Sequence, residues 1–276
     1  MPTPQTVPAL SLENIDLHYG FIRALDAVSF HVYPGEAVAL LGDNGAGKST
    51  LLKVMSGVHR PTVGRIRVHG TEVTFHSPQD SANAGIEMVY QDLALVEALD
   101  ASTNLMLGRE ILRRGPLGAL GFLDRKRMRR EAEREVEQLG VKIANMSRPV
   151  EMLSGGQRQG VALARSAVRV VGHERGILLL DEPTAALGYE QKVMVESLIK
   201  RLASQGIAVV VVTHDLQLAF SAAHRMVVLN RGKKVGDVMT SETTNDQIVG
   251  WITGAIPAQE GLSYAPTGAV TAQRKG

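Results

Sequence analysis

The segment at residues 42–50 restricts the fold of this 276-residue chain more than any other feature. Its sequence, Gly-Asp-Asn-Gly-Ala-Gly-Lys-Ser-Thr, matches the pattern G-x-x-x-x-G-K-[ST]. An apolar run at residues 37–41, typical of a buried strand, precedes it, and a helical pattern follows from Ser49 to Met55. Glycines let backbone N–H groups turn inward around phosphate oxygens, and a helix start adds a positive dipole end. We therefore predict a phosphate-binding loop between a strand and a helix.

The residues of this loop have separate expected roles toward a nucleotide. Lys48 would contact the β- and γ-phosphates, and the Ser49 hydroxyl would complete the shell of a Mg²⁺ ion. The predicted nucleotide-binding residues here are Gly42, Asp43, Asn44, Gly45, Ala46, Gly47, Lys48, Ser49 and Thr50. The alternative is a glycine-rich turn without a ligand, but a chance match in such a chain is on the order of one per cent.

Two acidic residues follow a second apolar strand pattern. The run Ile177–Leu180 is followed directly by Asp181 and Glu182. We expect Asp181 to hold Mg²⁺, directly or through water, and Glu182 to polarise the water that attacks the γ-phosphate. Alone this pattern is weak, because strands that end in turns often carry acidic residues. Together with the phosphate loop it predicts nucleotide hydrolysis.

The composition excludes several other kinds of site. Cysteine is absent, which excludes disulfides, thiolate metal sites and cysteine nucleophiles. The formal net charge of +2 gives no strong reason to expect nucleic-acid binding. No stretch approaches the roughly 20 apolar residues that cross a bilayer, and residues 1–10 do not resemble a secretory signal. A soluble, intracellular protein is therefore expected.

The first part of the chain changes from strand to helix patterns. Partly alternating apolar residues between positions 10 and 33 predict strands, and residues 61–76 predict a small antiparallel element. Helical patterns replace strands from about residue 95 to 168. Within them, the charged segment Asp124–Leu139 has apolar residues on one face at helical spacing. Its interleaved charges favour a solvated helix face over a nucleic-acid surface.

The second part of the chain predicts a parallel sheet. Strand patterns occur at Ile177–Leu180 and Ile207–Val212, with a helical stretch from Gln191 to Ser204 between them. That order is typical of β-α-β units. A final strand pair is expected at Arg225–Leu229 and Lys234–Val238. The fold class is therefore α/β.

A glycine-rich segment between the two chemical motifs points to a family. Leu153–Gln157 reads Leu-Ser-Gly-Gly-Gln. With it, the chain resembles the ATP-binding subunits of ABC transporters, of which this pentapeptide is a signature. A Ser-Gly-Gly turn ahead of a helix is physically another anion-binding N-terminus. The resemblance implies that Ser154, Gly155, Gly156 and Gln157 bind ATP held by a neighbouring subunit.

The same resemblance gives roles to three further residues. Tyr19 matches the aromatic that stacks on adenine, although a core aromatic of a strand is the alternative. Gln91 matches the Q-loop glutamine, which senses Mg²⁺ and the membrane partner, and His214 matches the switch histidine at the γ-phosphate. The expected catalytic residues are Lys48, Gln91, Glu182 and His214, and the expected Mg²⁺ ligands are Ser49, Gln91 and Asp181.

One position departs from the family pattern. After Pro183-Thr184 the family usually reads Ser-Ala-Leu-Asp, whereas this chain reads Ala-Ala-Leu-Gly and ends the motif at Gly188. The missing carboxylate normally takes part in contacts between two ATPase subunits. Its absence puts that communication in question but not ATP binding itself.

The resemblance, which extends over roughly residues 9–250, also sets the expected architecture. It implies a P-loop NTPase core with a mostly parallel sheet, an N-terminal antiparallel β subdomain and a helical subdomain insertion at about 95–168. We expect one ABC ATPase domain at 9–253, between a flexible N-terminus at 1–8 and a flexible C-terminal tail at 254–276.

Local similarity narrows the resemblance to importers of monosaccharides. The segment from Ser77 to Gln91 looks like the ATPases of ribose and fructose importers, and Gly42–Gly45 with Ala185–Gly188 looks most like the fructose branch. The implied assembly is a homodimer on integral-membrane permease subunits, at the cytoplasmic face of the cell membrane. A periplasmic or extracellular solute-binding protein is an indirect partner, and nucleic acid is not expected.

Other activities remain as alternatives at this point. The chain could serve another ABC importer, or be a soluble ABC-type ATPase that acts on nucleic acid or ribosomes. The near-neutral charge and the single copy of each motif disfavour the second. A P-loop kinase or GTPase leaves the Leu-Ser-Gly-Gly-Gln segment without a purpose. The sequence does not identify the sugar.

Overall fold

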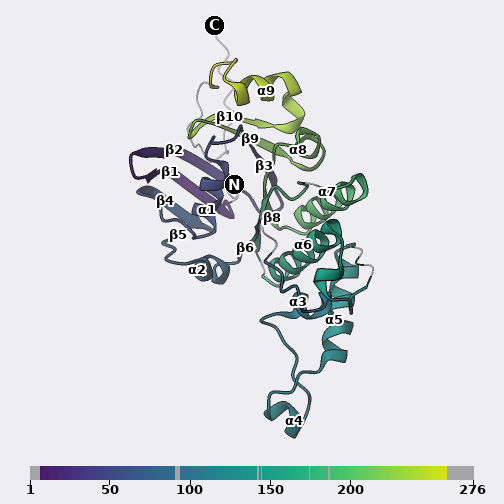
Figure 1. Ribbon diagram of the computed structural model, residues 1–276. Helices are drawn as coiled ribbons and strands as arrows, with labels where there is room; N and C mark the ends of the chain where they lie inside the picture. The colour runs from purple at the N-terminus through teal and green to yellow at the C-terminus, as the bar shows by residue number, and fades with distance from the viewer. Residues whose placement is uncertain are drawn as a thin grey trace, which may run out of the picture.

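A mixed sheet lies at the centre of the computed structural model, which describes residues 7–90, 94–141, 143, 145–173, 175–185 and 187–259 (Figure 1). In this part of the chain, six strands form the sheet in the order β10–β9–β3–β8–β7–β6. They are β10 (Lys233–Met239), β9 (Arg225–Asn230), β3 (Ala37–Leu41), β8 (Ala208–Val212), β7 (Ile177–Asp181) and β6 (Ile86–Val89). All neighbours run parallel except the antiparallel pair β10 and β9. The predicted α/β fold with a mostly parallel sheet is confirmed.

Both faces of the central sheet are covered, which explains the unbroken apolar runs of its strands. Successive side chains of a strand point to opposite faces. In β7, Ile177 and Leu179 pack with the N-terminal sheet and α1, whereas Leu178 and Leu180 pack with the helices of the other face. All four side chains are fully buried.

A second, antiparallel sheet covers one face of the first. Its order is β2 (Ile22–Val32), β1 (Leu10–Tyr19), β4 (Val63–Val68) and β5 (Thr71–Val73). Helix α1 (Lys48–Met55) lies between the sheets, because Leu51 and Leu52 share one buried cluster with Phe30 of β2 and Leu40 of β3. The antiparallel element predicted at residues 61–76 is confirmed as β4 and β5.

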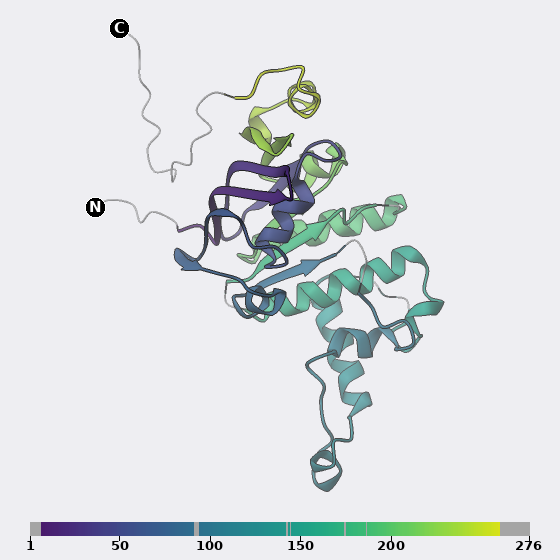
Figure 2. The ribbon, with the colours of Figure 1, turned by 60° about the vertical axis from the view of Figure 1, so that its left-hand side comes forward.

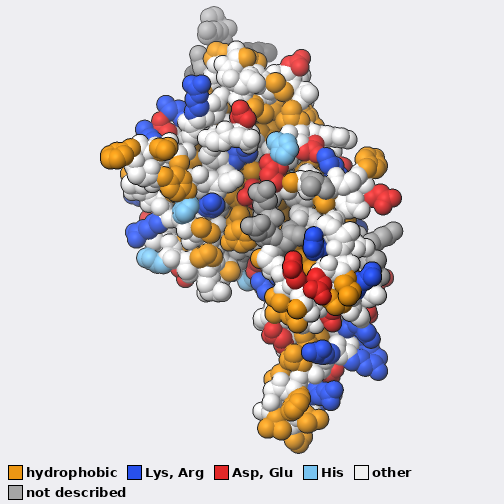
Figure 3. Space-filling model, in the orientation of Figure 1, with side chains coloured by type: hydrophobic (Ala, Val, Ile, Leu, Met, Phe, Trp, Pro, Cys, Tyr) orange, Lys and Arg blue, Asp and Glu red, His pale blue; other side chains and the backbone are white. Residues whose placement is uncertain are grey.

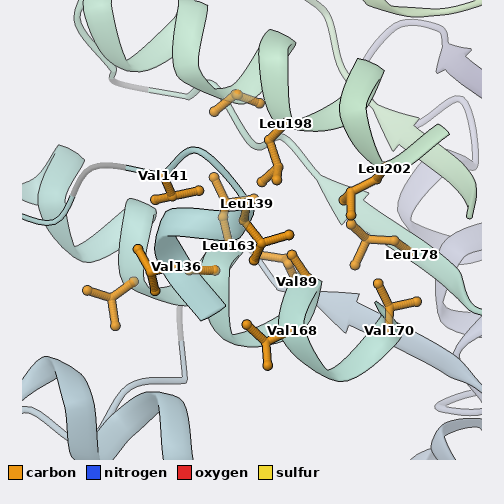
Figure 4. Close-up of a cluster of buried hydrophobic side chains, with 14 of the residues drawn as sticks. Val89, Val136, Leu139, Val141, Leu163, Val168, Val170, Leu178, Leu198 and Leu202 are labelled. Carbon is orange, nitrogen blue, oxygen red and sulfur yellow. The ribbon is translucent and has the colours of Figure 1, made fainter. Parts of the chain in front are cut away.

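Helices cover the opposite face of the central sheet. They include α3 (Ala101–Met106), α5 (Arg125–Gln138), the 3₁₀ helix η1 (Val150–Met152), α6 (Gly155–Val171) and α7 (Tyr189–Ser204). Figure 4 shows Val136 and Leu139 meeting Leu163 of α6 and Leu198 of α7. In α5, the buried residues are Met128, Ala132 and Val136, which confirms the predicted apolar face. Helix α6 continues past residue 168 and packs against β6 and β7 as well as α3.

A narrow arm projects from the helical region, with the short helix α4 (Pro116–Ala119) at its far end (Figures 1 and 2). The remaining helices are α2 (Pro78–Asn83), α8 (Leu216–Ala222), the 3₁₀ helix η2 (Thr240–Glu242) and α9 (Asn245–Thr253). Among the described residues, no helix combines the length and the apolar character required to cross a membrane.

Residues 254–259, which follow α9, fold back onto the protein, although we expected a flexible tail over 254–276. The Trp251 Nε1 group donates a hydrogen bond to the Pro257 carbonyl, at 3.1 Å. The backbone N–H of Gln259 donates to Val235 O of β10, at 2.9 Å. Residues 254–259 are thereby attached to α9 and to the edge strand.

Candidate active site

The phosphate loop follows β3 and leads directly into α1. Three of its glycines have a positive φ: 151° at Gly42, 77° at Gly45 and 101° at Gly47. A Cβ atom at Gly47 would lie 2.9 Å from the carbonyl oxygen of Ala24, and one at Gly42 would lie 2.4 Å from that of Leu229. Only glycine therefore fits at these two positions. Helix α1 begins at Lys48, one residue before the predicted start.

The Lys48 side chain is held against its own loop. Its ammonium group donates to the carbonyl oxygens of Gly42, at 2.9 Å, and Asp43, at 3.0 Å. Although Lys48 is buried in the fold, it also borders the open space beside the loop. The loop therefore carries a fixed positive charge next to its backbone N–H groups.

A cleft of about 490 Å³ opens beside this loop. Of the predicted nucleotide-binding residues, it is lined by Tyr19, Asn44, Gly45, Ala46, Gly47, Lys48, Ser49 and Thr50. Tyr19 is 45% exposed and meets His59 edge to face, with ring centroids 5.4 Å apart. The alternative that Tyr19 is a core aromatic is therefore wrong.

The cleft also contains residues that the sequence did not indicate. Ile22, Arg23 and Ala24 line it from the β1–β2 hairpin, and Arg231 and Gly232 line it from the β9–β10 turn. The Gly232 N–H donates to Ala46 O at 3.0 Å, and Asp26 N–H donates to Gly232 O at 2.8 Å. In the sequence, Arg231-Gly232 looked like an ordinary turn between two strands, and only the long-range packing places it at the phosphate loop.

The second part of the site lies at the ends of two neighbouring parallel strands. Asp181 of β7 pairs with Val212 of β8, and the Glu182 N–H donates to Val212 O at 2.9 Å. This register brings His214 beside Glu182, and its Nδ1 lies 2.9 Å from Glu182 Oε2. The two atoms are close enough for an ion pair, but their geometry is not that of a hydrogen bond. Glu182 Oε2 is buried and has no hydrogen-bond partner among the described residues. Glu182 adopts a left-handed backbone, with φ 48°, which is unusual for a side chain of its size.

The electrostatics at Asp181 suit a bound cation. Burial, and then the adjacent Glu182 carboxylate, raise the pKa of Asp181, whereas Lys48 and Lys53 act in the opposite direction. No group of three or more acidic or histidine side chains gathers to hold a metal within the described part of the chain. Mg²⁺ at nucleotide sites needs only one or two protein ligands besides phosphates. A hydroxyl from Ser49 and the carboxylate of Asp181 are a donor set of that kind.

The glycine-rich signature forms a separate surface. Ser154 is the N-cap of α6, and it exchanges two hydrogen bonds with Gln157 in a capping box, at 3.0 and 3.3 Å. A Cβ atom at Gly155 would point into open space, whereas a Cβ atom at Gly156 would lie 2.9 Å from Gln191 Cγ. None of Ser154, Gly155, Gly156 and Gln157, which are all described, lines the cleft at the phosphate loop. Gln91 lies outside the described residues.

The match to known proteins agrees with this arrangement. A family model described as "ABC transporter" matches residues 25–185, from the first part of β2 to just after Glu182. The chain belongs to the ABC transporter family. It is an ATPase of the ABC type, and the predicted resemblance is confirmed.

Several curated relatives of this ABC ATPase are named as sugar import proteins. The chain is 40% identical over 250 residues to a fructose import ATP-binding protein, FrcA, of Rhizobium meliloti. The match covers 90% of this chain and 95% of FrcA. The chain is also 40% identical over 239 residues to the xylose/arabinose import ATP-binding protein XylG of Sulfolobus acidocaldarius, covering 87% and 91%. A ribose import ATP-binding protein, RbsA, of Hahella chejuensis is 36% identical, and the chain spans 47% of its length.

Solved structures support the fold of this ABC ATPase. The ADP conformation of MJ1267, an ATP-binding cassette of an ABC transporter, superposes with a TM-score of 0.72 at 23% identity, covering 90% of this chain and 96% of that one. A dimeric post-hydrolysis state of the cassette MJ0796, bound to ADP and phosphate, gives a TM-score of 0.67 at 26% identity, covering 84% and 98%.

Proposed function

We propose that this ABC ATPase is the energy-coupling subunit of an importer for a monosaccharide such as fructose or ribose. The observation that carries the proposal is the 40% identity to FrcA along nearly the whole of both chains. Two segments that lie outside the family model also contribute to the site: the β9–β10 turn lines the cleft, and His214 lies beside Glu182. Hydrolysis of ATP would then provide the free energy for transport.

The cleft suggests how ATP is bound. The N–H groups of residues 44–49 and the start of α1 would bind the phosphates, and the Lys48 ammonium would exchange its carbonyl partners for phosphate oxygens. The exposed ring of Tyr19 offers a flat face at the same cleft for adenine. Ser49 and Asp181 would hold Mg²⁺, which neutralises charge on the β- and γ-phosphates when bound.

The pair of Glu182 and His214 would act on water and on the γ-phosphate. Glu182 has a buried carboxylate oxygen that can accept a proton from the attacking water. The oxygen of that water forms the new bond to the γ-phosphorus. The bond from that phosphorus to the bridging oxygen breaks, and ADP leaves. His214, whose side chain is 75% exposed, lies against the same carboxylate and is free on its other side to meet the γ-phosphate.

We further propose that two copies of the chain complete each site. Ser154 to Gly156 lie away from the cleft of their own chain, and the N-terminus of α6 is exposed. A second copy could present this surface to ATP, as the dimeric state of MJ0796 suggests. The dimer would work at the cytoplasmic face of the cell membrane on permease subunits. A periplasmic or extracellular binding protein would supply the sugar.

The catalytic proposal is tested with Glu182→Gln. This variant keeps the size and backbone of the residue but cannot accept a proton. Loss of a general base costs about 10²- to 10⁴-fold in rate, so ATP binding should persist while turnover falls by that factor. Glu190→Gln on α7 is the matched control, because it removes one exposed carboxylate away from the cleft. Near-normal turnover of Glu182→Gln would contradict the role of Glu182.

The two-copy arrangement is tested by crosslinking, which the absence of cysteine makes simple. In a Glu182→Gln background with ATP, a chain carrying Asn44→Cys should crosslink to a second chain carrying Ser154→Cys. A chain with Ser204→Cys, at the far end of α7, is the control that should not react. Absence of the first crosslink under these conditions would refute the head-to-tail geometry.

The substrate is tested in the assembled transporter. Reconstituted complexes should hydrolyse ATP faster when the binding protein is loaded with one member of a monosaccharide panel. Stimulation by none of these sugars would contradict sugar import. Copurification with RNA or ribosomes, rather than with membrane proteins, would favour the soluble alternative.

A further inference from the structure

The arm at residues 111–124 is a well-formed projection rather than a loose loop. Its two sides are joined by hydrogen bonds from Arg113 N to Phe122 O, at 2.8 Å, and from Asp124 N to Ile111 O, at 2.7 Å. The turn of α4 closes its far end, where Gly118 is buried. Gly118 packs so closely against the carbonyl oxygen of Arg113 that a Cβ atom would not fit. This geometry fixes which side chains point outward.

The far end of the arm exposes large apolar side chains. Leu120 is 74% exposed and Phe122 is 54% exposed, and Leu112 and Leu117 are also exposed. Figure 3 shows a hydrophobic surface at this end of the molecule. Single exposed apolar residues need no explanation, but four on one projection mark a binding surface.

Basic residues flank the apolar residues of the tip in the sequence, and Figure 3 shows Lys and Arg side chains on the arm next to its apolar end. Residues 111–130 contain seven basic residues and one acidic residue, whereas the whole chain has a net charge of only +2. The basic residues are Arg113, Arg114, Arg125, Lys126, Arg127, Arg129 and Arg130, and all are exposed. The acidic residue, Asp124, caps α5 through the Arg127 N–H. Only Arg129 has an ion-pair partner, Glu133 at 3.9 Å, within the part of the chain that the structure describes.

We propose that the tip of the arm enters the headgroup region of a bilayer that contains anionic lipid. Leu117, Leu120 and Phe122 would leave water for the apolar side of the interface, and the basic residues would lie among the phosphates. An apolar surface with a basic border is the pattern of proteins that bind at membrane interfaces. A second copy is a poorer occupant, because two such tips would bring twelve or more like charges together. None of the residues of the arm is assigned to ATP.

The experiment measures flotation of the purified full-length chain with vesicles. We expect binding to vesicles of phosphatidylcholine and phosphatidylglycerol in a two-to-one ratio, weak binding to pure phosphatidylcholine, and release at high salt. Each cation at an anionic surface contributes about fivefold in partitioning. Arg125→Gln with Lys126→Gln should therefore weaken binding by about 25-fold.

The apolar contribution is tested with Leu120→Ser and Phe122→Ser together, which should abolish flotation at intermediate salt. The matched control is Met239→Ser with Val249→Ser, which changes two exposed apolar residues distant in sequence from the arm. Retained binding of a fluorescent ATP analogue shows that each variant is folded. The proposal is overturned if the tip variant floats like the control, or if neutral and anionic vesicles bind equally. It is also overturned if the tip instead causes self-association without lipid, or if it binds only when the permease is present.

Discussion

Gly188 provides a sharp test of how this chain differs from its family. It is the N-cap of α7, with φ −71° and ψ 170°, and it has no side chain to accept a hydrogen bond from the helix. These angles are in the extended region that Asp adopts at N-caps. We therefore expect Gly188→Asp to stabilise the protein, since its carboxylate can accept from the Gln191 N–H.

The size of this effect follows from the local geometry. A Cβ atom at position 188 would lie 2.8 Å from Gln191 Oε1, which is the end of a flexible side chain and can rotate away. Because Ala introduces the same Cβ without a cap, Gly188→Ala is the matched comparison. Asp is a better N-cap than Ala by about 1 kcal/mol, and its charge also interacts favourably with the helix dipole. The Asp variant should therefore unfold about 2–4 °C above the Ala variant.

Thermal unfolding followed by circular dichroism measures the difference, with and without salt. An Asp variant that melts at or below the Ala variant would refute the capping argument. ATP-dependent crosslinking of the two chains then tests function separately. If the missing carboxylate limits communication between subunits, Gly188→Asp should also increase the ATP dependence of dimer formation.

Three further predictions concern the loop and the buried charges. Gly47→Ala should lower ATP affinity by about 5- to 30-fold, since the left-handed backbone alone costs on the order of 1–2 kcal/mol, and nucleotide titration measures it. Arg225 is buried against Glu36 and Asp237, each at 2.7 Å. Arg225→Leu should lower the free energy of unfolding by about 3–5 kcal/mol in urea titrations, because two buried carboxylates lose their partner; Arg225→Lys should recover part of it. Burial, and then the charge of Arg225, lower the pKa of His31 to about 4. Between that pH and about 6.5, His31 is protonated in the unfolded chain but neutral in the folded chain. The free energy of unfolding should therefore fall as the pH decreases from about 6.5 to 4, by less than about 1.4 kcal/mol per pH unit for this partly exposed group, and His31→Gln should flatten the slope.

Much of the fold followed from local patterns in the sequence. The run at Ile177–Leu180 became β7, because strands buried on both faces have continuous apolar sequences. Helix α7 begins at Tyr189, two residues before the predicted Gln191, because the chain enters the helix through Gly188 rather than through an apolar residue. Periodicity detects the buried face of a helix but not its polar first turn.

The parts of the site that were not predicted depend on contacts between distant segments. Arg23 and Arg231 reach the cleft from hairpins that are far apart in sequence. The closeness of His214 Nδ1 to Glu182 follows from the pairing register of β7 and β8. The arm was also not predicted, because the single helical spacing of Leu117 and Leu120 is too short to indicate an element, and their exposure is evident only in the structure.

The β9–β10 turn has a consequence for the smallest part of this chain that can bind nucleotide. Gly232 forms hydrogen bonds to Ala46 of the phosphate loop and to Asp26 of β2, so the floor of the cleft is held by three separated segments. A fragment that ended at residue 185, where the match to the family model ends, would contain the phosphate loop and both acidic residues. It would lack β8, β9 and the turn that braces the loop. The autonomous nucleotide-binding unit is therefore longer than the set of motifs that defines the family.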